Sequence, residues 1–131
     1  MGDVGEPGVG ALAERPDGVA VTAAMAVLAE WDSGAIPARL EVKAAVKATL
    51  AALVAAAPGR SVEVRVPPYA AVQVLEGATH RRGTPPAAVE CDARTWLQLA
   101  VGIVQWGDAV ADGRVRASGE RSDLSALLPL S

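Results

Sequence analysis

One histidine and one cysteine are the side chains in this sequence best suited to metal binding or nucleophilic chemistry. His80 and Cys91 each occur once among the 131 residues. A zinc site would need further carboxylate ligands beside them, and the short ligand spacings typical of zinc sites are missing. A nucleophile needs a base next to it, whereas Asp92 places negative charge beside Cys91 and disfavours a thiolate. We therefore interpret Cys91 as a small buried residue at a strand end, and we predict no metal, no cofactor and no catalytic residue.

The polar loop around the histidine is the cluster with a possible binding role. His80, Arg81 and Arg82 lie between two threonines in the run Thr79–Thr84. Guanidinium, imidazole and hydroxyl groups together are suited to a phosphate or carboxylate headgroup. The alternative is a charged surface loop that keeps a sheet edge from pairing with another chain. The sequence thus predicts His80, Arg81 and Arg82 as candidate headgroup ligands.

The elements that must position these residues are clearest in the C-terminal third of the chain. Asp92 is a good helix N-cap, and Gly102 is a good helix stop. In the strand that follows, Val115 and Ala117 alternate with arginines, which predicts one buried face. The expected order is a helix from 92 to 102, a short helix from 106 to 113, a strand from 114 to 118, and a short helix capped by Ser122 and ended by Pro129.

Two helices are predicted in the N-terminal half. The first helix is capped by Asp17 and ends near Gly34. The second helix extends from residue 39 to residue 57. Apolar residues recur at helical spacing in both, so each has one face for a core. For the second helix, the alternative to core packing is a membrane-surface or partner-docking role. The expected faces are Val21, Ala24, Met25, Leu28 and Trp31 in the first helix, and Val42, Val46, Leu50, Leu53, Val54 and Ala57 in the second.

Three strands are predicted between these helices and Asp92. Residues 62–66 alternate valine with charged residues, which is typical of a strand with one buried face. Pro67 and Pro68 cannot donate ladder hydrogen bonds, so we expect a hairpin turn there and a second strand from 69 to 75. Residues 77–86 form a loop, and residues 87–91 form the third strand.

The order of elements after Asp92 resembles the C-terminal half of the type-2 sterol carrier protein family, most closely its small bacterial orthologues. The resemblance extends more weakly back to about Pro58. It implies an α+β fold with a mainly antiparallel sheet of about four or five strands and helices packed on one face. The residues that carry the resemblance are Asp92, Thr95–Leu97, Leu99, Ala100, Gly102, Trp106, Asp108–Val110, Gly113–Val115, Ala117–Gly119, Asp123–Ser125 and Leu128–Leu130.

The same resemblance implies a lipid cavity between helices and sheet, with the last helix as a lid. The alternative for the same apolar residues, together with Val104, is an ordinary core. An empty pocket of ~300 Å³ would cost about 7 kcal/mol at ~24 cal/mol per Å³, so any cavity must be filled, wetted or collapsed when no ligand is bound. The candidate pocket residues are Trp96, Leu99, Ile103, Trp106, Val110, Leu124, Leu127 and Leu128.

Composition and charge narrow the class of protein. The chain is 51% hydrophobic with a net charge of −3, so a globular domain is expected and a basic nucleic-acid footprint is missing. Residues 1–16 are rich in glycine and proline, and we predict a disordered tail followed by a single domain from 17 to 131. We expect no membrane span and no signal peptide, and the lone cysteine favours a reducing, cytoplasmic location.

The preferred function is non-catalytic binding or carriage of a sterol or fatty-acyl ligand, as the family resemblance implies. The alternative is a protein-interaction or accessory module without a ligand, whose protein partner the sequence does not indicate. A third option is an enzyme that relies on His80 and Arg82. A continuous internal cavity would favour the first reading, and a flat exposed apolar patch the second.

Overall fold

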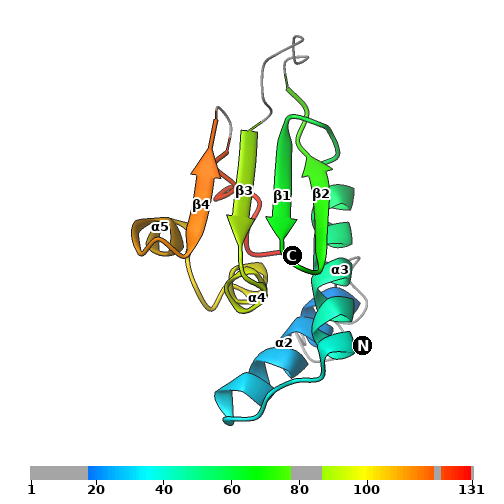
Figure 1. The fold of residues 1–131 in the computed structure, drawn as a ribbon. Coiled ribbons are helices and arrows are strands. Elements are labelled where there is room, and N and C mark those ends of the chain that lie inside the picture. The colour runs from blue at the N-terminus through cyan, green and yellow to red at the C-terminus, as the bar shows by residue number, and fades with distance from the viewer. Residues whose placement is uncertain (1–17, 78–86, 120–121, 131) are drawn as a thin grey trace, which may run out of the picture.

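The protein is an open β-sheet with helices behind it and below it (Figure 1). The structure is a computed structural model that describes residues 18–77, 87–119 and 122–130. The predicted tail at 1–16 and the headgroup candidates His80, Arg81 and Arg82 lie outside these residues. The α+β class predicted from the sequence is confirmed. In chain order the described elements are α2 (Gly18–Asp32), α3 (Arg39–Ala56), β1 (Val62–Val66), β2 (Ala70–Val74), β3 (Ala87–Cys91), α4 (Ala93–Val101), α5 (Trp106–Ala111) and β4 (Val115–Ser118).

The four strands form one mixed sheet in the order β2-β1-β3-β4. β1 and β2 form the expected antiparallel hairpin, with the Tyr69 N–H donating to the Val66 carbonyl over 2.9 Å beside the two prolines. β3 pairs parallel to β1, and β4 pairs antiparallel to β3. Two of the three ladders are therefore antiparallel, as the prediction of a mainly antiparallel sheet requires.

One face of this sheet carries the core. Val62, Val64 and Val66 of β1 are buried, as are the β3 residues in register with them. The prediction for Ala117 is wrong: the sequence predicts that it is buried beside Val115, whereas it is exposed. β4 is an edge strand, and along it the burial stops after its first residue.

Helix α3 supplies the main helical face against the sheet. The Glu41 carboxylate accepts from the Ala38 N–H over 3.2 Å and so closes the first turn. The predicted stripe is confirmed from Val42 to Leu53, and Val54 packs against it partly buried. Lys43 and Lys47 lie off the stripe and are exposed, as the pattern predicts.

Helix α2 buries a slightly different face from the predicted one. Met25 is expected in the core but is half exposed, and Val27 is buried instead. The reason is compositional: from Gly18 to Ala29 the helix has no charged residue, so its apolar pattern marks no single face clearly. The residues that α2 buries are Gly18, Ala20, Val21, Ala24, Val27 and Leu28.

Helix α4 enters the core at once after β3. The Asp92 carboxylate accepts from the Thr95 N–H over 2.7 Å, so the predicted N-cap is confirmed, and Gly102 ends the helix with φ +88°. Trp96 is fully buried, and its indole N–H donates to the Thr49 hydroxyl of α3 over 2.8 Å. This bond fixes the position of α4 against α3.

The predicted C-terminal helix is wrong. Residues 125–127 form a single turn, in which the Leu127 N–H donates to the Leu124 carbonyl over 2.9 Å. The Ser122 hydroxyl does not cap a helix but donates to the Gly119 carbonyl over 3.0 Å. Pro129 disfavours helical backbone at the residue before it, which leaves too short a segment for a helix to persist. We call residues 122–130 the C-terminal segment.

Candidate functional site

The predicted pocket residues divide into three groups by burial. Trp96, Leu99 and Leu124 are 1%, 1% and 0% exposed, and all three belong to one continuous core. A side chain with almost no accessible area borders no space large enough for a water molecule. In this conformation there is therefore no room for a ligand beside these three residues.

The second group is half-buried. Trp106 of α5 and Leu127 and Leu128 of the C-terminal segment pack against the core without being enclosed by it. The third group faces solvent, since Ile103 is 60% exposed and Val110 is 40% exposed. The structure thus brings together the first two groups, whereas Ile103 and Val110 lie outside the core.

Two further apolar residues belong with these groups: Val104, which the sequence includes in the apolar core set, and Leu130, which was not predicted from the sequence. Val104 is half-buried against the core, and Leu130 is buried. Val104 lies in the irregular connection between α4 and α5, where periodicity gives no indication of which side is covered. Leu130 follows Pro129 at the very end of the chain, and only its contacts with distant residues bury it.

The C-terminal segment lies against the C-terminal end of α4. The Leu130 N–H donates to the Ala100 carbonyl over 2.9 Å. A Cβ at Gly102 would come within 3.2 Å of Pro129, so the glycine allows the segment to approach closely. Among the described residues this is the one backbone hydrogen bond between the segment and the helices. Leu124 and Leu130 are therefore the two buried apolar residues that hold the segment against the core.

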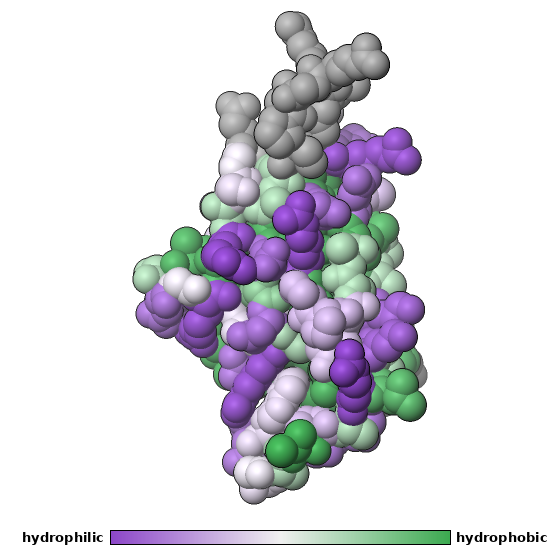
Figure 2. All heavy atoms as spheres, viewed as in Figure 1, coloured by the Kyte–Doolittle hydropathy of each residue, from purple (hydrophilic) through white to green (hydrophobic). Residues whose placement is uncertain are grey.

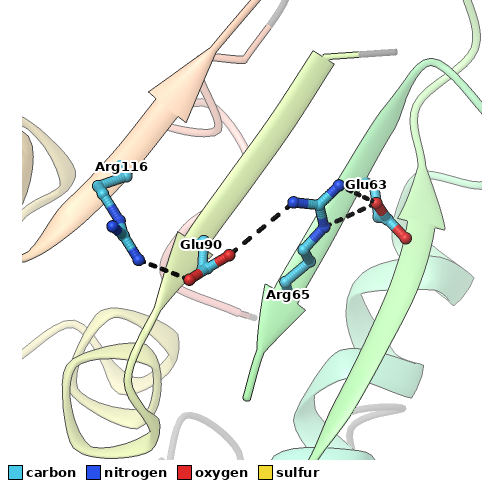
Figure 3. Close-up of polar contacts among 4 residues, drawn as sticks. All are labelled: Glu63, Arg65, Glu90 and Arg116. Atoms are coloured by element: carbon cyan, nitrogen blue, oxygen red, sulfur yellow. Dashed lines mark hydrogen bonds and ion pairs between the residues drawn. The ribbon is translucent and has the colours of Figure 1, made fainter. Parts of the chain in front are cut away.

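The opposite face of the sheet is polar. Arg116 of β4 pairs with Glu90 of β3 at 2.6 Å, and Arg65 of β1 lies 2.6 Å from Glu63 and 3.9 Å from Glu90 (Figure 3). Figure 2 shows purple and pale surface across this side of the molecule. Such exposed pairs contribute about 0–1 kcal/mol each. This charge ladder keeps the face hydrated, and an apolar ligand would not bind there.

A depression of about 500 Å³ lies at one end of the charge ladder. Its charged groups already have partners: Arg114 pairs with Asp112 at 2.8 Å, and the Asp92 carboxylate caps α4. These charged groups are therefore not free to act as a base or to bind an anion. The lining residues are Pro67, Glu90, Cys91, Asp92, Gly113, Arg114 and Arg116.

Cys91 borders this depression, but its thiol is poorly suited to act as a nucleophile. Burial, together with the neighbouring Asp92 and Glu90 carboxylates, raises the pKa of its thiol from 9.0 to about 12. The thiol is therefore protonated at neutral pH. This agrees with the interpretation of Cys91 as a small buried residue at the end of a strand.

Metal-binding clusters and membrane-spanning helices are both missing from the described part of the chain. There, no three His, Cys, Asp or Glu side chains gather closely enough to hold a metal ion. None of the described helices combines the length and the apolar character needed to cross a bilayer.

β2 ends and β3 begins at the upper end of the sheet in Figure 1, and the predicted headgroup residues lie between these two strands in the sequence. Gly119, at the end of β4, lies so near Ala87 that an added Cβ would come within 2.8 Å of the Ala87 Cα. The C-terminal segment starts just after Gly119. β2 therefore ends, and β3 and the C-terminal segment begin, at the same end of the sheet.

Comparison with known proteins identifies a family. Residues 38–130 match the model of a family described as bacterial SCP ortholog, where SCP stands for sterol carrier protein. The matched range begins directly before α3 and ends with the C-terminal segment, so α2 precedes it. No curated protein matches the chain.

Proposed function

The chain belongs to the bacterial SCP ortholog family, and from that premise we propose that it binds or carries one apolar lipid-type molecule without catalysing a reaction. The family resemblance predicted from residues 92–130 is thereby confirmed. Lipid binding or carriage is the general activity that this family suggests. The sterol or fatty-acyl class of the ligand, and the residues that contact it, are our proposal.

The observation that supports this proposal is that the C-terminal segment covers an apolar interior and has few backbone hydrogen bonds to the rest of the described fold. Leu127 and Leu128 are half-buried, and a single backbone hydrogen bond joins the segment to α4. Since the core around Trp96 has no free space, a ligand enters only if the segment moves. We propose that the segment swings away and that the acyl chain or sterol takes the place of Leu124.

The energies of this exchange are favourable by order of magnitude. Exposing two buried leucines costs about 3–6 kcal/mol, at ~1.5–3 kcal/mol each. Burial of a fatty-acyl chain contributes ~0.8 kcal/mol of favourable binding free energy for each methylene buried. About eight buried methylenes would therefore offset the displacement of Leu124 and Leu130. A ligand with a shorter apolar part would not open the segment.

The polar end of the ligand is assigned to the loop between β2 and β3. His80, Arg81 and Arg82 supply cationic and hydrogen-bonding groups suited to a carboxylate or phosphate. β2 ends, and β3 and the C-terminal segment begin, at the same end of the sheet, as Gly119 beside Ala87 indicates. In this proposal Trp106, Leu127 and Leu128 line the entry, and Ile103 and Val110 lie at its outer margin.

Native mass spectrometry of the purified protein, followed by organic extraction, tests the proposal. The expected result is an adduct whose mass matches a sterol or fatty-acyl compound in the extract. A protein that carries no adduct even after incubation with mixed lipids would favour the alternative, an interaction module without a ligand. A cytoplasmic location remains a prediction that rests on the lone, buried Cys91.

A further inference from the structure

The connection between α2 and α3 presents the most exposed large apolar side chains of the described chain. Ile36 is 90% exposed and Leu40 is 78% exposed. Pro37, between them, is buried and fixes the connection against the rest of the fold. This connection forms the lowest part of the molecule in Figure 1, away from the sheet and the C-terminal segment. We call residues 35–47, which include the first turns of α3, the α2–α3 tip.

Three cations line the same side of the tip. Arg39, Lys43 and Lys47 recur every four residues, so they form one stripe along α3, adjacent to Leu40. All three are exposed, and none of them forms an ion pair or a side-chain hydrogen bond with another residue that the structure describes. By contrast, the arginines that the structure describes on the strands and before β4 each pair with a carboxylate, as Arg65 does with Glu63.

Two of the three acidic groups near the tip have other partners. Glu41 accepts from the Ala38 N–H at the start of α3, about half a turn around the helix from Arg39. Asp32, at the end of α2, pairs with Arg94 at 3.1 Å. Glu30 is half-buried on α2. The stripe on α3 therefore remains available to an anionic surface.

We propose that the α2–α3 tip docks on an anionic lipid bilayer. Ile36 and Leu40 enter the boundary between headgroups and acyl chains, and the three cations contact lipid phosphates. A peripheral protein binds a bilayer in this way, through a few buried apolar groups and attraction to anionic lipids. The docking surface is separate from the C-terminal segment, so it does not depend on the proposed cargo site.

The size of the tip favours a bilayer over a protein partner or a second copy of the chain. A stable protein interface buries ~800 Å² on each partner and has a packed apolar centre. Two apolar side chains at the end of a helical connection provide much less than that. A bilayer needs no matching shape, and it receives protruding side chains such as Ile36 and Leu40 directly.

Co-sedimentation with vesicles tests the docking site. The full chain is mixed with vesicles of phosphatidylcholine alone or of phosphatidylcholine and phosphatidylglycerol in equal parts. We expect binding to the anionic vesicles that weakens as salt is added, because exposed charges are screened. Replacing Arg39, Lys43 and Lys47 by Gln should lower the partition coefficient by about fivefold for each charge removed.

The apolar part is tested with Ile36→Ser and Leu40→Ser together, which should lower the partition coefficient by about tenfold or more. Val19→Ser, an exposed apolar site at the other end of α2, and Arg60→Gln, an exposed cation beyond the other end of α3, are the matched controls. Thermal melts check that every variant is folded.

Several outcomes would overturn the docking site. They are wild-type binding that is equal on neutral and anionic vesicles, no binding to either, or controls that lose as much as the tip variants. Self-association that Ile36→Ser and Leu40→Ser abolish would assign the tip to a second copy instead. Binding of a fluorescent fatty-acyl probe is measured on the same variants. Retained probe binding with lost vesicle binding separates the docking site from the cargo site.

Discussion

At the scale of single residues, the bond between Trp96 and Thr49 joins the two halves of the fold. The Thr49 hydroxyl accepts from the indole N–H and itself lies within hydrogen-bonding distance of the Ala45 and Val46 carbonyls. Both side chains are buried, so water cannot replace a lost partner. The sequence pattern places Thr49 on the core-facing side of α3, among apolar residues. The hydroxyl is acceptable there because it donates within its own helix and accepts from the indole.

Trp96→Phe is expected to destabilise the domain by about 1–3 kcal/mol, because it leaves the buried Thr49 hydroxyl without its donor. Denaturant unfolding measures the change. Thr49→Val combined with Trp96→Phe is the control, and its cost should be smaller than the sum of the two single changes. Strictly additive costs would show that the bond between α3 and α4 contributes nothing.

Cys91 gives a pH-dependent prediction. Its thiol pKa is raised from 9.0 to about 12, so the folded state keeps a proton that the unfolded chain loses. Stability from this group is therefore full below pH 9 and is lost as the pH rises from 9 towards 12, by up to about 1.4 kcal/mol per pH unit. Cys91→Ala should show a shallower decline over the same window. Equal slopes, or rapid labelling of folded protein by a thiol reagent at neutral pH, would contradict the raised pKa.

At the scale of elements, a set of hydrogen bonds made by Leu75, which we call the latch, joins the end of α3 to the end of β2. The Leu75 N–H donates to the Ala57 carbonyl over 2.8 Å, and the Leu75 carbonyl accepts from the Ser61 N–H and hydroxyl over 3.0 and 2.7 Å. Gly59 lies directly against that carbonyl, and an added Cβ would collide with it. The latch places the hairpin of β1 and β2 on α3.

Gly59→Ala is expected to cost about 3 kcal/mol, the upper end of overpacking costs, because backbone must move to make room. Gly34→Ala is the matched control. Gly34 also has a positive φ, of +89°, but an added Cβ there would meet nothing within 4 Å. It should cost about 1 kcal/mol, from backbone strain alone. Thermal or denaturant unfolding compares the two, and equal costs would mean that the latch can relax.

The C-terminal segment gives the element-scale prediction that bears on function. Leu124→Ala should destabilise by about 2–5 kcal/mol, since Leu124 is fully buried. Leu128→Ala, at a half-buried site, should cost roughly half as much or less, yet it should speed release of a bound probe. Unfolding curves and stopped-flow off-rates on both variants provide the comparison. An unchanged off-rate for Leu128→Ala would remove the segment from the ligand pathway.

Local sequence patterns predicted most of these elements, and long-range contacts decided the rest. Alternating valines in β1, the Asp92 cap and the stripe from Val42 to Leu53 depend on neighbours in sequence, and all are confirmed. The parallel pairing of β1 with β3 and the burial of Leu130 depend on residues far away in the chain. The predicted C-terminal helix failed because three leucines at helical spacing also suit an irregular segment anchored at its two ends.

The candidate site was predictable in its residue types but not in its burial. An apolar set is expected from the sequence, but core and pocket residues have the same composition. Only the fold shows that Trp96 and Leu124 are enclosed while Trp106 is half-covered and Ile103 is in solvent. Exposure likewise identifies Ile36 and Leu40, which in the sequence look like ordinary apolar positions at a helix start.

At the scale of the whole molecule, three surfaces have separate roles. The open sheet face is a hydrated charge ladder, the α2–α3 tip is the proposed docking surface, and the C-terminal segment covers the proposed cargo site. In Figure 1 the segment passes behind the sheet, and the tip lies at the lower end. A lipid carrier of this form would contact a membrane through the α2–α3 tip and would admit its ligand where the C-terminal segment moves away.

The measurement that tests lipid binding most directly is a titration of the full chain with a fluorescent fatty-acyl probe, followed by competition with unlabelled fatty acid and sterol. We expect saturable binding of one probe per chain at micromolar concentration or below, and displacement by at least one competitor. Binding should weaken in the variant with Arg81→Ala and Arg82→Ala if the ligand is anionic. The absence of saturable binding across fatty-acyl, sterol and phospholipid probes would contradict the proposed function.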